Sequence, residues 1–482
     1  MPDVIIVGAG PTGVMLASEL RLHGVEVLLL ERELEPSPMV RAQGIHARTI
    51  EIMEQRGMLD RLLPQGQVHP TDRFFAGIQP SEPVRLDTTH PYVLGIPQPE
   101  VEKVLMERAV ELGVEVRRGC EVVGVHEGRD GAGVELVGGE RLQARFVVGC
   151  DGGRSTVRKA LGIEFAGEPA TSGWILGEVE LTATTEEVSA ITKRVRETHK
   201  GFGIVPRDGG VFSVVTPADP PSDDTPPPTI DELRAQLTAY AGSDLGAHSP
   251  RWLSRFGDAT RLAEHYRRGS VLIAGDAAHV HPPQGGQGLN LGIQDAFNLG
   301  WKLAAAVRGW SPRGLLDTYE SERRPVAAEV LTLTRAQALL QSAEPGPRAV
   351  RSLLAELMEL PGVHRHLIDK VTSLGIWYAV GEGELLGQRS RDIAFTGGRR
   401  LYPLLRSGRG VLVDQTGSLT VSGWHDRVDV LAERSDELDP PAVLLRPDGH
   451  IVWVGDDESD LEEALLRWFG ASLSGPAAAN GA

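Results

Sequence analysis

The first thirty residues of the chain alternate between two apolar patterns. Residues 4–7 form a short run rich in β-branched side chains, which is typical of a buried parallel strand. Residues 15–23 then have helical spacing and stop at Gly24, and residues 25–30 form a second apolar run. This order of strand, helix and strand predicts a βαβ unit at the start of an α/β domain.

Further along the chain, the pattern changes twice. Residues 174–216 alternate between apolar and polar positions, which favours antiparallel strands, and the proline-rich segment 217–229 predicts a surface loop. Residues 271–279 return to the continuous apolar run of a parallel strand. We therefore expect a discontinuous first domain, with an inserted sheet beside it that could serve as a substrate platform.

The last third of the chain is first helical and then mixed. Residues 315–360 have mostly helical spacing, with one break predicted at Pro325 and another at the Pro-Gly-Pro sequence that follows it. From about Gly387, short strands and a terminal helix at 456–469 indicate a small α/β domain. Pro441 precedes one of its strands, as in thioredoxin-like folds, but the absence of cysteine from this domain excludes thiol redox chemistry there.

The turn after the first strand carries the first chemical motif. Gly8, Gly10 and Gly13 form the pattern G-x-G-x-x-G, in which the first glycine allows a tight turn. The second lets the backbone approach a pyrophosphate, and the third lets helix and strand pack closely. Glu31, at the end of the second strand, can accept hydrogen bonds from an adenosine ribose. The motif predicts a dinucleotide site, FAD or NAD(P), with a βαβ turn that binds no phosphate as the alternative.

Two more glycine turns follow strands later in the chain. In the first, Asp151 stands at the strand end and Ser155 is placed to cap the next helix. In the second, Asp276 stands at the strand end, before the glycine-rich loop 285–288. Their free amide groups suit phosphate or flavin oxygens, and three such turns in one chain make ordinary helix capping a weak explanation.

Composition and charge narrow the class of protein. The 482 residues include 49 Lys and Arg against 66 Asp and Glu, a net charge of −17 that argues against nucleic acid or an anionic membrane as a partner. The two cysteines, Cys120 and Cys150, show no disulfide framework or metal spacing. No signal segment or membrane-spanning run is apparent, so we expect a cytoplasmic protein.

The three glycine turns, at residues 8–13, 151–158 and 275–282, together resemble the fingerprints of the class A flavoprotein aromatic hydroxylases. Within that class, residues 248–261 and 285–295 are most similar to the rifampicin monooxygenases. The resemblance implies one bound FAD, NADPH as a transient reductant without a domain of its own, and O2 as co-substrate. It also implies insertion of one oxygen atom into an electron-rich ring.

Pattern and resemblance together predict an α/β fold with a Rossmann-like, GR2-type FAD-binding domain. An inserted mixed or antiparallel β-sheet substrate domain, a long helical segment at 315–360 and a C-terminal thioredoxin-like domain complete it. The expected boundaries are residues 1–72, 98–172 and 262–385 for the FAD domain, 73–97 and 173–261 for the substrate domain, 386–472 for the C-terminal domain and 473–482 for a disordered tail.

The resemblance also assigns cofactor-binding residues. It implies that the glycines of the first turn meet the ADP pyrophosphate, Glu31 the ribose, and Asp276 the ribityl chain or pyrophosphate. Asp151 would lie in a turn linked to both FAD and NADPH. The full set predicted to bind cofactor is Gly8, Gly10, Thr12, Gly13, Glu31, Arg32, Arg41, Gln98, Val122, Asp151, Thr156, Asp276, Pro283, Gly286, Gly288, Leu289 and Asn290.

Few residues are expected to act on the substrate directly, because the flavin supplies the oxidant in this class. Arg41 and Arg196 are the catalytic candidates, since a cation beside the ring would favour a phenolate. The substrate candidates are Phe74, Arg196, Phe202 and Gly203. For Arg196 the alternative is a solvated surface charge, and for the two phenylalanines it is the core. His279 is either a base or, more in keeping with its pattern, a hydrogen-bonded structural histidine.

For a rifamycin substrate, the resemblance implies hydroxylation at the naphthohydroquinone carbon that bears the ansa amide nitrogen, followed by ring opening and inactivation of the antibiotic. The alternatives are a hydroxylase of another aromatic polyketide, of the anthracycline, angucycline or tetracycline type, in biosynthesis or resistance, and a non-enzymatic GDI-like binding protein. A flavin-dependent halogenase would carry a Trp-x-Trp-x-Ile-Pro segment, which this sequence lacks. We expect no metal, and a homodimer is a possible assembly.

Overall fold

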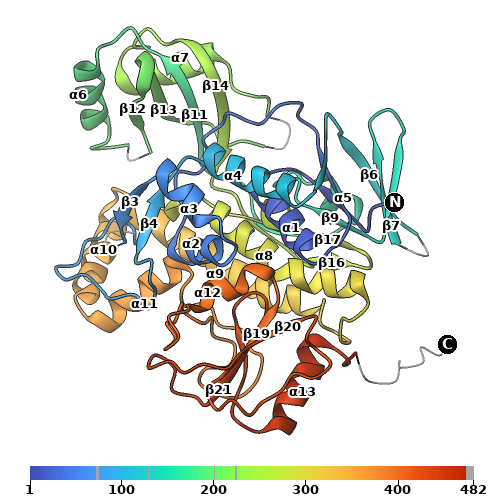
Figure 1. Cartoon of the computed structure of the whole chain (residues 1–482). Coiled ribbons are helices and arrows are strands. Elements are labelled where there is room, and N and C mark those ends of the chain that lie inside the picture. Colours follow the sequence, from blue (N-terminus) through green and yellow to red (C-terminus); the bar gives the residue numbers. More distant parts are fainter. Residues whose placement is uncertain (72–74, 129–130, 200, 223–224, 474–482) are drawn as a thin grey trace.

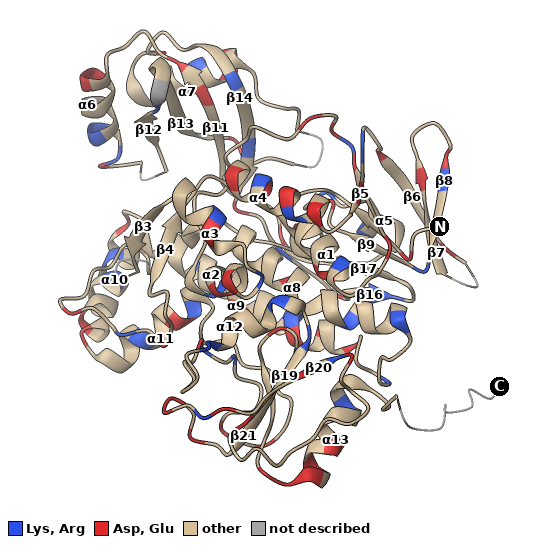
Figure 2. Ribbon diagram, viewed as in Figure 1, with Lys and Arg blue, Asp and Glu red and all other residues tan. Residues whose placement is uncertain are grey.

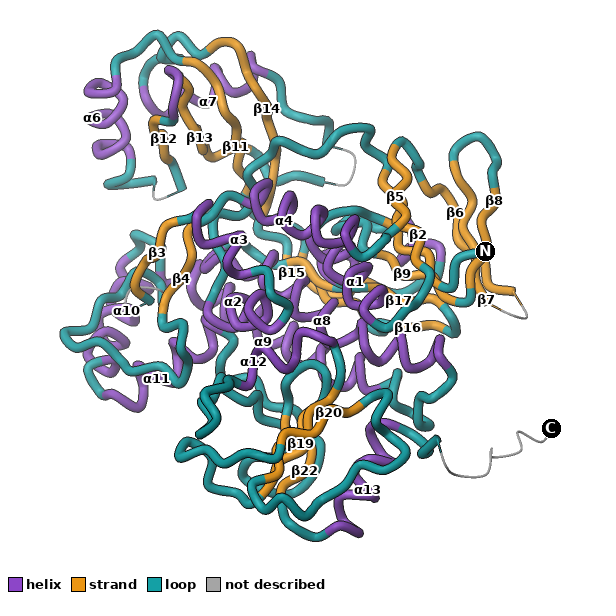
Figure 3. The backbone as a smooth tube through the Cα atoms, viewed as in Figure 1, coloured by secondary structure: helices purple, strands orange, loops and turns teal. Residues whose placement is uncertain are grey.

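The computed structural model describes residues 1–71, 75–128, 131–199, 201–222 and 225–473, so most of the predicted tail lies outside the described residues. A central body of sheet and helices carries two smaller lobes (Figures 1 and 3). One lobe is the inserted sheet, at the top of Figure 1, and the other is the C-terminal region, at the bottom. This architecture confirms the predicted α/β fold with an inserted antiparallel sheet.

The main sheet is assembled from segments that are far apart in the sequence. β1 pairs in parallel with β2 and with β9, and β17 pairs in parallel with β9. The strand predicted after residue 270 therefore does join the opening βαβ unit. Across the sheet the order is β16 (Arg267–Arg268), β17 (Val271–Ile273), β9 (Phe146–Gly149), β1 (Val4–Val7), β2 (Val27–Glu31) and β5 (Glu115–Arg118).

Two helices pack closely on one another beside this sheet. α1 (Pro11–Leu22) and α8 (Gln287–Arg308) cross at Gly300, where a Cβ atom would lie 2.4 Å from the Cβ of Glu19. β1 is fully buried, as its unbroken apolar run predicts. The other helices around the body are α2 (Ala47–Gln55), α3 (Leu59–Leu62), α4 (Gln98–Glu111) and α5 (Thr156–Ala160).

Smaller sheets surround the main one. β10 (Phe165–Glu168), β15 (Thr260–Ala263) and β18 (His279–Val280) form an antiparallel sheet beside the second and third glycine turns. β7 (Gly131–Leu136) and β8 (Arg141–Ala144) form a hairpin, which β6 (Val122–Gly128) extends. β3 (Gln67–Pro70) and β4 (Tyr92–Gly95) form a further pair.

The inserted sheet is antiparallel, in the order β12 (Gly203–Pro206), β13 (Val211–Ala218), β11 (Gly173–Glu180) and β14 (His248–Gly257). One face packs against α6 (Thr185–Val195) and α7 (Ile230–Ala241). The core between them includes Ile175, Val179, Phe202, Val214 and Leu233.

The C-terminal lobe is a four-stranded mixed sheet with a terminal helix. Its strands are β20 (Val428–Leu431), β19 (Gly410–Asp414), β21 (Ala442–Leu445) and β22 (Ile451–Val454), with α12 (Leu401–Leu404) before the sheet and α13 (Glu458–Phe469) after it. β19 and β20 are parallel, and the other neighbours are antiparallel. The thioredoxin-like description of this lobe and the domain boundaries stay predictions.

Two predictions about helices were wrong. α9 (Thr318–Leu340) runs through Pro325 without a break. Proline removes a hydrogen bond to the carbonyl four residues earlier, but here that carbonyl belongs to Ser321, which is exposed to water. Helical spacing in the sequence also predicts a helix from the segment after Arg41 through Leu63, but this helix, α2, ends at Gln55, because Gly57 takes a left-handed φ of 70°. The second predicted break is confirmed: α9 ends at Leu340, and α10 (Pro345–Met358) begins with the Pro-Gly-Pro sequence. α11 (Pro361–Thr372), which lies beyond the predicted helical segment, follows.

Buried ion pairs attach the C-terminal lobe to the central body. Arg446 donates to both carboxylate oxygens of Glu322 on α9, at 2.7 and 2.9 Å, and to Asp448 at 2.5 Å. Lys302 of α8 donates to the same Glu322 at 2.7 Å. Burial raises the pKa of Glu322, but the charges of Arg446 and Lys302 outweigh burial and lower that pKa to about 2.

Along the rest of the ribbon, positions of Lys and Arg and positions of Asp and Glu are interspersed (Figure 2). Among the described residues, no helix combines the length and the apolar character needed to cross a bilayer.

Replacing Arg446 by alanine should destabilise the folded protein strongly. The change leaves Glu322 and Asp448 buried without their main counter-charge, which costs about 3–5 kcal/mol in comparable sites. The control is Arg399→Ala, because Arg399 is half exposed in its pair with Glu433 and should contribute less than about 1 kcal/mol. Urea unfolding measures both, and equal losses would contradict the expectation.

Acid should also weaken the fold through His450. Burial lowers the pKa of His450 to about 4 from 6.5, against the opposing charge of Asp448. Between these values the unfolded chain binds a proton that the folded chain does not, so stability present above pH 6.5 is lost as the pH falls towards 4. The loss from this group is at most about 3 kcal/mol.

We expect His450→Gln to flatten the fall of unfolding free energy between pH 6.5 and 4. His425→Gln is the control, since His425 is exposed in the same lobe. Parallel pH curves for wild type and His450→Gln would show that His450 is not responsible.

Candidate functional site

The opening turn, at residues 8–13, borders a space at Gly10 that no described atom fills. A Cβ on Gly8, which has a φ of 104°, would lie 2.4 Å from the carbonyl oxygen of Cys150, and a Cβ on Gly13 would lie 2.0 Å from that of Gly8. Close packing therefore requires glycine at these two positions. A Cβ on Gly10 would meet no described atom within 4 Å. Gly10 thus borders open space, as expected where a pyrophosphate approaches the backbone.

The helix after this turn presents a free N-terminus. Gly10 is the N-cap of α1, Pro11 is its first residue, and no described side chain caps it. Such an end attracts an anion through its amide groups and its dipole. Glu31 stands beside the turn, where its carboxylate accepts from the amide of Ala9 at 2.9 Å and from that of Glu33 at 3.0 Å.

The Asp151 carboxylate accepts three hydrogen bonds from residues just after it in the chain, which the sequence did not predict. The carboxylate accepts from the hydroxyl of Ser155 at 2.5 Å and from the amides of Thr156 and Val157 at 2.7 and 3.1 Å. Ser155 caps α5 as predicted, by accepting from the amide of Arg158. The Asp151 side chain thus holds the start of α5, and cofactor roles for Asp151 and Thr156 stay predictions.

Asp276 is the carboxylate that faces outward. It lies in the short turn Gly275–Ala277, is exposed, and has no hydrogen-bond or ion-pair partner among the described residues. A Cβ on Gly288 would lie 3.9 Å from its Oδ1 atom, so Asp276 borders the first turn of α8. An unpartnered carboxylate here suits the hydroxyl groups of a ribityl chain.

The start of α8 is also free of a side-chain cap in the described structure. Gly285 and Gly286 have left-handed φ values of 72° and 62°, and Gly286 is the N-cap. The side chain of Asn290 accepts from the amide of His46 at 2.8 Å and donates to the carbonyl of Gly286 at 2.8 Å. Asn290 therefore positions this loop. Pro283 is exposed, and Leu289 is half-buried against the central core.

Arg41 and Gln98 come from segments that the fold brings side by side. The amide of Gln98 donates to the carbonyl of Ala42 at 2.9 Å, and its side chain donates to Glu102 at 2.7 Å. Burial raises the pKa of Glu102, and the hydrogen bond from Gln98 and the charge of Arg41 oppose that rise. Arg41 itself is exposed and donates to the sulfur of Met39. Arg32, nearby in sequence, is exposed and pairs with Glu33.

His279 is a structural histidine, which was the alternative that its pattern favoured. It is fully buried, and its Nε2 atom lies 2.6 Å from a carboxylate oxygen of Asp295. The other oxygen of Asp295 accepts from Arg323 at 2.8 Å. Burial raises the pKa of Asp295, but the charges of His279 and Arg323 outweigh it and hold the pKa below its usual value.

The predicted substrate residues that the structure describes lie in different environments. Phe202 is 1% exposed and belongs to the core of the inserted lobe, and Arg196 is exposed at the end of α6. Gly203 begins β12, and a Cβ there would meet no described atom within 4 Å. Val122 is buried at the start of β6, and Phe74 lies outside the described residues.

Known families match almost the whole chain. The family described as "FAD binding domain" matches residues 1–334, and "Aromatic-ring hydroxylase, C-terminal" matches residues 383–472. A rifampicin monooxygenase of Streptomyces venezuelae is 59% identical over 477 residues, covering 98% of this chain and 100% of that protein. One from Rhodococcus hoagii is 56% identical, with coverage of 98% and 99%.

The chain belongs to the FAD-dependent aromatic-ring hydroxylases. The solved structure of an anhydrotetracycline hydroxylase from Streptomyces rimosus agrees, with a TM-score of 0.88, 39% identity and coverage of 98% of this chain and 99% of that one. As a hydroxylase of this family, the protein uses FAD, and NADPH and O2 are typical co-substrates. The open space at Gly10, the unpartnered Asp276 and the two uncapped helix ends fit that cofactor.

Alanine substitutions at two of the opening glycines should distinguish the contribution of this turn to stability from its contribution to cofactor binding. Gly10→Ala places its Cβ in the open space, so we expect FAD affinity to fall at least about ten-fold. Stability of the apoprotein should fall by about 1 kcal/mol at most. Gly13→Ala forces a Cβ onto the Gly8 carbonyl and should cost about 2–3 kcal/mol of stability.

FAD fluorescence titration and urea unfolding of the apoprotein give the two measurements. Unchanged FAD affinity in Gly10→Ala would show that the space beside Gly10 does not hold the cofactor.

Proposed function

We propose that this hydroxylase acts on rifampicin and thereby inactivates the antibiotic. The observation that supports this most is identity of 59% and 56% to two rifampicin monooxygenases across nearly the full length of every chain compared. Identity to the anhydrotetracycline hydroxylase is lower, at 39%, over a similar coverage. Hydroxylation of a tetracycline-type polyketide is therefore the second candidate.

A flat apolar wall supports a large aromatic substrate. The face of the inserted sheet opposite its helices carries Trp174 and Phe256, whose rings stack with centroids 5.4 Å apart. Leu176 and Val215 pair on the same face, and all four side chains are half-buried. Stacked aromatic rings of this kind offer a surface for a planar ring system.

The connectivity of the strands supports a position for one end of this wall near the proposed cofactor site. β14 ends at Gly257, just after Phe256, and the chain enters β15 at Thr260. β15 pairs with β18, which leads directly into the loop before α8. We therefore propose that the substrate lies between the Trp174–Phe256 pair and the loop Gly286–Asn290. Gly203, which pairs with Val215 on the far side of the sheet from Phe256, would leave room for its outer part.

FAD that is bound to the protein and reduced by NADPH would supply, together with O2, the oxidant for hydroxylation. The residues of this chain bind, orient and exclude water. The uncapped start of α8 directs amide groups and a positive dipole end towards the site, which favours negative charge there. We propose that Arg41, beside Gln98, contributes a cation, and that Arg196 does so only if the inserted lobe approaches the site.

The proposed position of attack is the naphthohydroquinone carbon that bears the ansa amide nitrogen. An added hydroxyl at that carbon makes the C–N bond liable to cleavage, which would open the macrocycle. A homodimer and a cytoplasmic location accompany this proposal as expectations from the sequence.

Purified holoenzyme should oxidise NADPH faster with rifampicin than without it. We expect mass spectrometry to find a product heavier than rifampicin by one oxygen atom. Anhydrotetracycline serves as the comparison substrate. If it gives the larger stimulation and rifampicin gives no oxygenated product, the second candidate replaces the first.

The same assay tests whether the substrate contacts the sheet face that carries Trp174 and Phe256. Trp174→Ala should raise KM for rifampicin by about ten-fold while FAD content stays unchanged, because a stacked aromatic contact is lost. Trp377→Ala is the matched control, since Trp377 is half exposed outside the inserted lobe. An equal KM in both variants would place the substrate elsewhere.

A further inference from the structure

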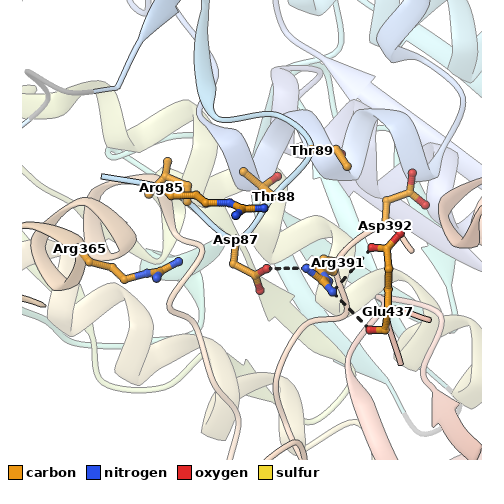
Figure 4. Close-up of a pocket in the computed structure, with 9 residues that line it drawn as sticks. Arg85, Asp87, Thr88, Thr89, Arg365, Arg391, Asp392 and Glu437 are labelled. Carbon is orange, nitrogen blue, oxygen red and sulfur yellow. Dashed lines mark hydrogen bonds and ion pairs between the residues drawn. The ribbon is translucent and has the colours of Figure 1, made fainter. Parts of the chain in front are cut away.

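A cavity lies where three separate parts of the chain meet. Its volume is about 500 Å³. The lining comes from the loop 85–89, from Arg365 on α11, and from Arg391, Asp392 and Glu437 of the C-terminal region (Figure 4). Neither the cofactor site nor the proposed substrate wall includes any of these residues.

The acidic residues of this cavity already have partners. Arg391 lies between Asp87 and Glu437, at 3.4 and 3.7 Å, as Figure 4 shows. Asp392 pairs at 2.5 Å with Arg400, which lies outside the lining. Arg391 and Arg400 together therefore offset two of the three carboxylate charges of the cavity.

Two arginines of the lining are not compensated in this way. Arg85 is exposed and has neither an ion pair nor a side-chain hydrogen bond in the part of the chain that the structure describes. Arg365 has one ion partner there, Asp369, at 3.8 Å. This distance is too long for a hydrogen bond, so the N–H groups of Arg365 remain available as donors in the described part of the chain.

Both guanidinium groups project into the same side of the cavity, next to Asp87 (Figure 4). Two arginine forks that meet at one space can donate several parallel hydrogen bonds to the oxygens of a phosphate group. The hydroxyl of Thr89, also in the lining, is exposed and available as a further donor.

We propose that this cavity binds a phosphate group through Arg85 and Arg365. The group bridges the loop 85–89 and α11 at the edge of the C-terminal lobe, so its binding also strengthens the packing of these parts. It can come from free phosphate or from a phosphate ester such as the 2′-phosphate of NADPH. Binding requires no aromatic substrate, so the site can be tested whether or not rifampicin is the substrate.

The test is calorimetric titration of the FAD-loaded protein with inorganic phosphate, at constant ionic strength set by chloride. We expect one site per chain in the wild type and a Kd at least about ten-fold weaker in the double variant Arg85→Ala, Arg365→Ala. Arg313→Ala, another exposed arginine, should leave the Kd unchanged. The double Arg→Lys variant, which keeps the charges but not the forks, should bind with intermediate affinity.

A parallel titration with 2′,5′-ADP distinguishes the two sources. Tighter binding of 2′,5′-ADP than of phosphate, lost in the double alanine variant, identifies the nucleotide phosphate. Equal affinity identifies free phosphate. Absence of phosphate binding in the wild type, or a Kd that is the same in wild type and double variant, overturns the proposal. If the alanine variant is poorly folded, the comparison of wild type with the lysine variant decides.

Discussion

The hydrogen bonds and ion pairs of the buried Asp295 carboxylate hold together the elements on the proposed cofactor side of the molecule. One oxygen accepts from the ring of His279 and from the amide of Gly275, and the other accepts from Arg323. A carboxylate with no exposure would be very costly without such donors. Because these donors come from three elements, Asp295 ties the third glycine turn to α8 and α9. The neighbouring Asp276 is thereby left facing outward.

The helix that carries Asp295 serves both ends of the central body. The first turn of α8 adjoins the glycine-rich loop 285–288. Asn290 joins that loop to the segment before α2 by hydrogen bonds. The second half of the helix carries Lys302, which joins the ion cluster of Glu322 and Arg446. The cofactor site and the attachment of the C-terminal lobe therefore share one rigid element, α8.

Several features of the candidate site could be predicted because they depend on neighbours in sequence. The spacing of Gly8 and Gly13 reflects a turn whose packing excludes a Cβ, and Ser155 caps α5 within four residues of its own position. The ion pairs of Asp295 and Arg446 could not be predicted in the same way. A single charged residue within an apolar helix, such as Asp295, or at the end of an apolar strand, such as Arg446, gives no sign of a partner that lies far away along the chain.

The sequence by itself determined the βαβ start, the three glycine turns, the inserted antiparallel sheet and the membership of a flavoprotein class. The first three rest on local periodicity or on close spacing, which short-range sterics and hydrogen bonds enforce, and the flavoprotein class rests on resemblance to a known family. Only the tertiary structure decided how similar residues divide their roles. Asp151 caps a helix while Asp276 stays free, and Phe202 enters the core while the opposite sheet face presents Trp174 and Phe256. Which partners a side chain meets depends on segments distant in sequence, and only packing brings those segments together.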